Sequence, residues 1–174
     1  MTTTTVLRTI TGQDLGTQLH SKRLGLTLCA SKMEPVTNDR FHKPQGGLWT
    51  STANDETVSG WYEWGKNEGM IDPNAVTWTL IPEPNALLVE IDSYGDLTAL
   101  VAQYGGSGSY GQLVIDFEAM ARDGYDGMHL TDRGQWATRM SKPNLYGWDC
   151  ESTVWFRWAF SSVVGTTAEV VNAA

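Results

Sequence analysis

The stretch Asp149-Cys-Glu-Ser-Thr-Val-Trp-Phe-Arg-Trp-Ala-Phe160 alternates between two kinds of side chain and predicts a β-strand. Successive side chains of a strand point to opposite faces of the sheet. One face is apolar and must face the core: Val154, Phe156, Trp158 and Phe160. The other face mixes acidic, aromatic and basic groups: Asp149, Glu151, Thr153, Trp155 and Arg157.

This mixed face is the first candidate for chemistry. A carboxylate pair at the strand entry, Asp149 and Glu151, lies on the same face as Trp155. A few polar groups beside an aromatic wall are typical of a ligand cleft. The alternative is a solvated outer face on which Glu151 pairs with Arg157. The alternation itself is compatible with both interpretations.

A second candidate segment is His42-Lys-Pro-Gln-Gly-Gly-Leu-Trp-Thr-Ser-Thr52. Glycine lets a backbone approach a ligand closely, which makes Gly47 a candidate contact. Trp49 and Ser51 share one face of the strand predicted for residues 48–52. The side chains of His42 and Lys43 are suited to contacting phosphate. The alternative is a loop and turn that lead into a core strand.

The remaining pattern predicts many short strands and a few helices. Strands are expected at residues 6–10, 24–29, 76–81, 86–91 and 126–130. Helices are expected at 13–21, at 60–68 after a Ser59 cap, at 94–104 after a Ser93 cap, and at 117–123 after an Asp116 cap. Polar loops are expected at 30–46, 105–111 and 131–146. Without regular βαβ alternation, this order favours an α+β fold of mixed, mainly antiparallel sheets with a few short helices around a cleft.

Composition limits the class of protein. The 174 residues suit a single domain spanning 1–174, with flexible tails at 1–5 and about 165–174. Hydrophobic residues make up 41%, enough for a core. The formal net charge of −8 argues against broad nucleic-acid binding. Two cysteines, no apolar leader and no long apolar run predict a cytoplasmic chain without a membrane segment.

Other site signals are weak, apart from the tryptophans. The three histidines, at positions 20, 42 and 129, lack metal-ligand spacing, so no metal site is expected. The sequence carries no P-loop, GxGxxG or GxSxG motif. Gly124-Tyr-Asp-Gly-Met-His129 is best explained as a helix C-cap that leads into a strand. Eight tryptophans serve either a thick core or an aromatic-walled pocket, and Trp61 on the helix predicted for 60–68 is a candidate for the pocket.

Three of these segments together resemble the ADP-ribosyltransferase fold. They are the strand Gly47-Leu-Trp-Thr-Ser-Thr52, the later Gly124-Tyr-Asp-Gly127 before a strand, and Glu151 at the start of the final strand. The match is to the arginine–serine–glutamate class, and the chain also resembles uncharacterised proteins of actinobacterial phages. Thr50-Ser-Thr52 is similar to the middle element of that class, and Asp149-Cys-Glu151 to the last, with Asp149 in place of Glu or Gln. Arg8 is the best match to the first element, with His20 as its rival if the class is the histidine-containing one.

The resemblance implies an NAD-dependent ADP-ribosyltransferase or NAD glycohydrolase, with NAD as substrate and no metal. It implies that Glu151 stabilises positive charge on the ribose as the nicotinamide–ribose bond breaks, with support from Ser51. Arg8, His42 or Lys43 would hold phosphate or ribose. Trp49, Trp61 and Trp155 would face the nicotinamide cation. Asp149 occupies a position that helps to choose the acceptor, which is open between a host macromolecule and water.

Two other interpretations remain open. The same tryptophans could form a non-catalytic phage or bacterial module that sequesters a nucleotide or inhibits a host protein. The chain could instead be a structural virion or assembly protein. A pure scaffold has no need to place Asp149 and Glu151 beside Trp155 on a face outside the core. This placement favours the enzyme and the binding module over the structural protein.

Overall fold

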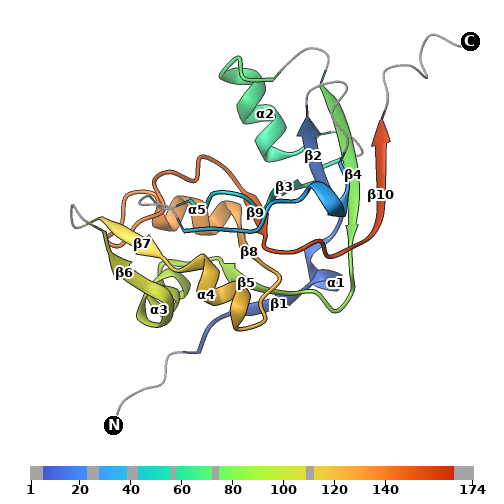
Figure 1. Cartoon of the computed structure of the whole chain (residues 1–174). Helices are drawn as coiled ribbons and strands as arrows, with labels where there is room; N and C mark the ends of the chain where they lie inside the picture. The colour runs from blue at the N-terminus through green and yellow to red at the C-terminus, as the bar shows by residue number, and fades with distance from the viewer. Residues whose placement is uncertain are drawn as a thin grey trace, which may run out of the picture.

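The computed structural model describes residues 6–22, 28–38, 43–55, 58–71, 75–108 and 112–166. Figure 1 shows a curled sheet with short helices around it, as expected for an α+β fold. Across the sheet the strands run in the order β1 (Thr9–Thr11), β5 (Leu87–Ile91), β8 (Gly127–Leu130), β9 (Ser152–Trp155), β3 (Leu48–Thr52), β2 (Gln18–Lys22), β4 (Val76–Pro82) and β10 (Phe160–Thr166). All neighbouring pairs are antiparallel except β5 and β8.

Strand β3 joins the two halves of the sheet. On one edge it pairs with β9, where Thr50 lies opposite Thr153. On the other edge it pairs with β2, where Leu19 lies opposite Ser51. Three segments that are far apart in the sequence therefore lie side by side, with β3 in the middle.

The helices are α1 (Gly12–Leu15), α2 (Gly60–Asn67), α3 (Tyr94–Tyr104), α4 (Phe117–Arg122) and α5 (Asp132–Thr138). A 3-10 turn, η1, covers Ala30–Lys32, and a small hairpin pairs β6 (Gly105–Ser107) with β7 (Leu113–Ile115). The predicted caps are present: Ser59, Ser93 and Asp116 each accept a hydrogen bond from a backbone N–H of their helix. Such a bond satisfies one of the donors that a helix start leaves open.

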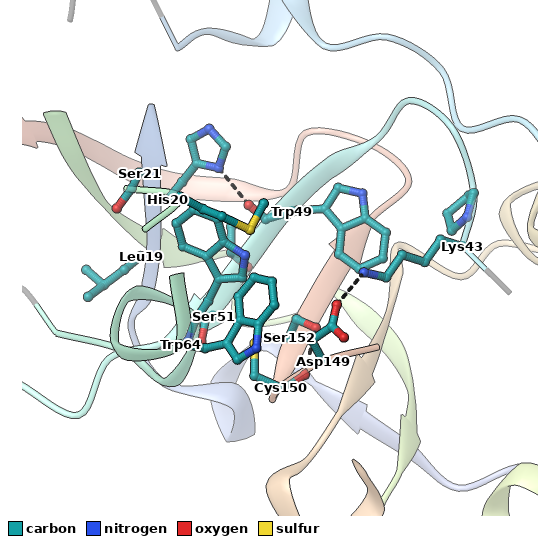
Figure 2. A pocket seen from close by; sticks show the side chains of 14 residues that line it. Leu19, His20, Ser21, Lys43, Trp49, Ser51, Trp64, Asp149, Cys150 and Ser152 are labelled. Carbon is teal, nitrogen blue, oxygen red and sulfur yellow. Dashed lines mark hydrogen bonds and ion pairs between the residues drawn. The ribbon is translucent and has the colours of Figure 1, made fainter. Parts of the chain in front are cut away.

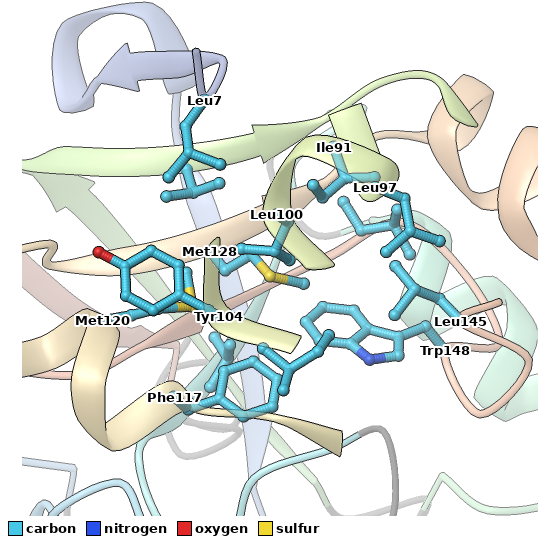
Figure 3. Close-up of a cluster of buried hydrophobic side chains, with 14 of the residues drawn as sticks. Leu7, Ile91, Leu97, Leu100, Tyr104, Phe117, Met120, Met128, Leu145 and Trp148 are labelled. Atoms are coloured by element: carbon cyan, nitrogen blue, oxygen red, sulfur yellow. The ribbon is translucent and has the colours of Figure 1, made fainter. Parts of the chain in front are cut away.

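The main core lies between the β5–β8–β9 half of the sheet and helices α3 and α4. Figure 3 shows part of it, including Ile91, Leu100, Phe117 and Trp148. These four side chains are at most 1% exposed. Burying one such side chain contributes roughly 1.5–3 kcal/mol.

A second core cluster packs against the other face of β9 and β3. It includes Leu48, Leu80, Leu88, Trp155 and Phe160. Both faces of β9 are therefore buried. This overturns the expectation that one face of the last strand is open to a ligand: Trp155 is 0% exposed and packs edge-on against Phe160 at 4.6 Å between ring centroids.

Other expectations also needed correction. The strand predicted over 149–160 is two strands, β9 and β10, with Arg157 in the bend between them. The helix predicted over 13–21 is the single turn of α1, followed by Gly16 at φ 73° and then by β2. The loop predicted over 131–146 contains α5, capped by Thr131. Most of the strand predicted over 24–29 and the tail 1–5 lie outside the described residues. The tail predicted from about 165 begins later, because β10 continues to Thr166, and residues 167–174 lie outside the described residues.

Within the described parts of the chain, no helix has the length and apolar character that crossing a membrane requires.

Candidate functional site

The carboxylate of Glu151 is held by three donors from β3. Ser51 Oγ donates to Oε2 at 2.5 Å, and Thr52 Oγ1 donates to Oε1 at 2.9 Å. The backbone N–H of Thr52 donates to both oxygens, at 3.0 and 3.2 Å. These bonds form because Glu151 immediately precedes β9, which pairs with β3.

Burial and hydrogen bonding act on Glu151 in opposite directions. The side chain is only 9% exposed, and desolvation raises the pKa of the carboxyl above its usual value. Nearby Asp132 adds to that rise in pKa, whereas the bonds from Ser51 and Thr52 lower it. The donors on β3 thus offset part of the rise in the Glu151 pKa that desolvation causes.

His129 on β8 lies behind the carboxylate. Its Nδ1 is 3.6 Å from Glu151 Oε1 and 2.9 Å from Thr153 Oγ1. Burial lowers the pKa of His129 to about 4, so the imidazole is neutral at physiological pH. The contact between His129 and Glu151 is consequently not an ion pair there.

A cavity of about 410 Å³ opens in front of Ser51. Figure 2 shows Ser51, Trp49 and Trp64 around it, with Asp149, Cys150 and Ser152 also in the lining. The residues on both sides of Glu151 in the chain line this cavity, but Glu151 itself does not. Its carboxylate lies one hydrogen bond behind the wall, through Ser51.

Three tryptophans form much of the wall. Trp49 comes from β3, and Trp61 and Trp64 come from α2. The start of α2 is fixed against β3, because the backbone N–H of Trp61 donates to Ser51 Oγ at 3.3 Å. Trp49 is held in turn by Trp148, with ring centroids 4.8 Å apart. Aromatic faces held in this way suit a planar or cationic ligand.

The charged rim of the cavity is formed by Lys43 and Asp149. Lys43 Nζ lies 3.5 Å from Asp149 Oδ2 and 5.6 Å from the centre of the Trp49 ring. Both charged side chains are more than a third exposed, so the pair contributes little to stability. The lysine is placed to meet an anionic group at the mouth of the cavity.

Gly47 has a structural reason for lacking a side chain. Its φ is 66°, and a Cβ there would lie 2.7 Å from the Trp155 carbonyl oxygen. The residue is also absent from the lining of the tryptophan cavity. Close packing of β3 against β9 therefore explains the glycine, which lines a different cavity, of about 470 Å³, together with His20 and Trp49.

Two other candidates lie away from the cavity, and a third lies outside the described residues. Arg8 precedes β1, at the far end of the sheet order, and pairs with Glu90 and with Asp92, the latter at 3.2 Å. Trp155 is buried in the second core cluster, so the expectation that it binds a cofactor is not met. His42 lies outside the described residues.

Sequence reasoning missed some residues of the site and left one open. His20, the rival of Arg8, lines the cavity from β2, and its Nδ1 lies 2.7 Å from the Trp49 carbonyl oxygen. Trp64, which sequence reasoning missed, lies three residues after Trp61 on α2, and this helical spacing is the signal that could have placed both on one wall. Met70, also in the lining, follows α2 without a sequence signal.

Among the described residues, no group of three or more His, Cys, Asp or Glu side chains is arranged to hold a metal ion. The cavity lining offers tryptophan faces, serine hydroxyls, the Asp149 carboxylate and the Lys43 amine as its chemistry.

Comparisons with protein-family models, with curated proteins and with solved structures found no match for this chain.

Proposed function

We propose that the chain is an ADP-ribosyltransferase-like enzyme that cleaves the nicotinamide–ribose bond of NAD⁺. The observation that carries the proposal is the Glu151 carboxylate, held by Ser51 and Thr52 directly behind a tryptophan-walled cavity. It joins two of the three segments on which the resemblance to that family rests, residues 47–52 and 149–151.

The cavity suits one end of the dinucleotide. Its volume of about 410 Å³ lies in the range of roughly 300–1,000 Å³ typical of small-molecule sites. The nicotinamide ring of NAD⁺ is a planar cation, which Trp49, Trp61 and Trp64 would contact through their faces. Lys43 at the rim would meet the pyrophosphate. The rest of the dinucleotide would extend out of the cavity.

In the proposed reaction the bond between ribose C1′ and the nicotinamide nitrogen breaks. The electron pair leaves with nicotinamide, which becomes neutral, and positive charge develops on the ribose. Glu151 would stabilise that charge from its fixed position, and fixed charges lose little energy to reorganisation. An acceptor then bonds to C1′ and gives up its proton. Asp149, half-buried at the rim, is placed to contact that acceptor.

The proposed location is the cytoplasm, that of the host cell if the chain is phage-encoded. NAD⁺ is available there, and the two described cysteines are both free thiols.

A second candidate function is a non-catalytic module that binds a nucleotide. It is favoured by one observation: the Glu151 carboxylate is 9% exposed, is saturated by donors from β3, and lies behind the cavity lining. Such a module would use the tryptophans to bind and would leave the ligand intact.

The test is to incubate the purified chain with NAD⁺ and to measure released nicotinamide. We expect release by the natural chain and a loss of two or more orders of magnitude in Glu151→Gln. Glu68→Gln is the matched control, because Glu68 is exposed at the end of α2, away from the cavity lining. Quenching of tryptophan fluorescence by NAD⁺ without nicotinamide release would support the binding module. Equal release by Glu151→Gln and the natural chain would overturn the enzymatic assignment.

A further inference from the structure

A chain of four hydrogen bonds runs through the sheet and ends on Glu151. Trp155 Nε1 donates to Thr50 Oγ1 at 2.9 Å, and Thr50 Oγ1 donates to Gln18 Oε1 at 2.6 Å. Gln18 Nε2 then donates to Thr52 Oγ1 at 3.0 Å, and Thr52 Oγ1 donates to Glu151 Oε1 at 2.9 Å. The chain connects β9, β3 and β2 before it returns to the residue that precedes β9.

The direction of this chain is fixed by chemistry. An indole N–H can only donate, so the hydroxyl of Thr50 accepts from Trp155 and has one hydrogen left to give. Gln18 takes that hydrogen on its oxygen and turns its nitrogen to Thr52. With the amide flipped, the Thr50 hydrogen would have no acceptor, and Thr52 would donate to Gln18 in place of Glu151. Every donor in the chain therefore points toward the carboxylate.

The surroundings make the direction important. Trp155 and Gln18 are 0% exposed, and Thr50 is 4% exposed. Hydrogen bonds in a dry interior polarise one another, so donors that point the same way act together on the final acceptor. The imidazole of His129 beside the carboxylate is neutral at physiological pH and supplies no compensating charge. The ionised form of the Glu151 carboxyl is therefore stabilised by the oriented donors of β3 and Gln18.

We infer that Gln18 is a positioning residue for Glu151. Together with Thr50 and Trp155, it aims the Thr52 hydroxyl at Oε1 and so favours the ionised form of this buried carboxyl group. The catalytic use of Glu151 rests on the proposed function, but the chain of hydrogen bonds is a property of the folded chain.

Thr50→Val tests the inference two bonds away from the carboxylate. The substitution keeps the shape of the side chain and removes the hydroxyl, while Ser51, Thr52 and Glu151 stay in place. Thr50→Ser restores a hydroxyl at this position and should restore the natural pKa of Glu151. Thr138→Val is the matched control, since Thr138 is also buried and donates to a backbone carbonyl, that of Gly134, outside this chain of bonds.

The readout is the pKa of Glu151, followed by NMR in protein with ¹³C-labelled glutamate and assigned with Glu151→Gln. We expect Thr50→Val to raise this pKa by about half a unit or more, the order expected when a bond to a carboxylate weakens. Thr50→Ser and Thr138→Val should leave it unchanged. The titratable groups nearest the carboxyl, Asp132, His129 and Cys150, are the same in every variant. A well-folded Thr50→Val with the natural pKa would overturn the inference.

Gln18→Met offers a second variant of similar volume if Thr50→Val does not fold, with the same expected rise in the pKa of Glu151. The NMR measurement needs no turnover. If no nicotinamide is released by any variant and the pKa still shifts, the proposed function fails and the positioning role stands. If NAD⁺ is cleaved, the pH profile of kcat should shift with the pKa while KM stays constant.

Discussion

Ser51 and Glu151 are 100 positions apart in the sequence, yet the Ser51 hydroxyl donates to the Glu151 carboxylate at 2.5 Å. The contact exists because β3 and β9 are neighbours in the sheet. Ser51 also accepts the backbone N–H of Trp61, so one hydroxyl connects the carboxylate, the sheet and α2.

Replacing Ser51 with Ala should destabilise the fold. The change removes one of the donors to a buried carboxylate, and a buried group left short of a partner costs about 1–3 kcal/mol. Urea unfolding at neutral pH measures the loss. Ser161→Ala is the control, since that exposed hydroxyl only donates to backbone carbonyls, and its effect should stay within about 0.5 kcal/mol. Equal stability of the two variants would contradict the assignment.

Gly47→Ala and Gly69→Ala separate steric overlap from backbone strain. Both glycines have a positive φ, 66° and 68°, but a Cβ at Gly47 lies 2.7 Å from the Trp155 carbonyl oxygen, while Gly69 has nothing within 4 Å. We expect Gly69→Ala to lose roughly 1–2 kcal/mol from strain alone. Gly47→Ala should lose clearly more, because β3 and β9 must separate. The comparison is made by thermal and urea unfolding, and a smaller loss at Gly47 would refute the packing argument.

Stability should fall as the pH drops from about 6.5 to about 4, through His129. The folded-state pKa of this buried histidine is about 4, below its usual value of 6.5, so the unfolded chain binds the proton first. The stabilisation is present above pH 6.5 and is lost on acidification, by about 3 kcal/mol over that window. The raised pKa of Glu151 acts the opposite way and stabilises the fold as the pH falls.

His129→Gln isolates the histidine contribution, since glutamine does not titrate. Its free energy of unfolding, measured by urea titration at pH 7 and pH 5, should depend less on pH than that of the natural chain. The same dependence in both proteins would show that His129 is not the group that titrates.

The two cysteines should react with iodoacetamide at very different rates. Burial, with Glu151 and Asp149 close by, raises the pKa of Cys150 to about 12, whereas a hydrogen bond with Ser31 lowers the pKa of Cys29. Because the thiolate is the nucleophile, Cys29 should be alkylated at least about tenfold faster at pH 8. Mass spectrometry of Cys29→Ser and Cys150→Ser resolves the two sites. Faster reaction of Cys150 would contradict the burial of its thiol.

Local signals in the sequence were enough for part of the fold. Helices α2, α3 and α4 begin at the predicted caps because Ser59, Ser93 and Asp116 act on their own first turns. The α+β class followed from the number of short strands. These features depend on residues three or four positions apart, which a single sequence displays directly.

The burial of both faces of the last strand could be recognised only from the whole structure. Alternation over residues 149–160 identifies two faces, but it cannot say that both are buried. Trp155 reads as the wall of a cleft until Leu48, Leu80 and Phe160 are seen around it. The indole N–H suggests an open face, but the structure satisfies it inside, on Thr50.

Which of Arg8 and His20 lies beside the cavity could not be read from the sequence. His20 lines the cavity because β2, which carries it, pairs with one edge of β3. Residues 13–21 resemble a helix, so β2 was hidden from pattern analysis. Arg8 lies next to β1, and its guanidinium forms ion pairs with Glu90 and Asp92.

The position of β3 between β9 and β2 has a practical consequence. The same strand supplies Leu48 to the interior and Ser51 to the cavity, so loosening one disturbs the other. A small molecule that binds in the cavity of the folded chain should therefore raise the melting temperature of the entire domain, and the rise should grow with the logarithm of its concentration above Kd. A thermal-shift screen of nucleotides and their fragments would then identify the natural ligand without any assumption about turnover.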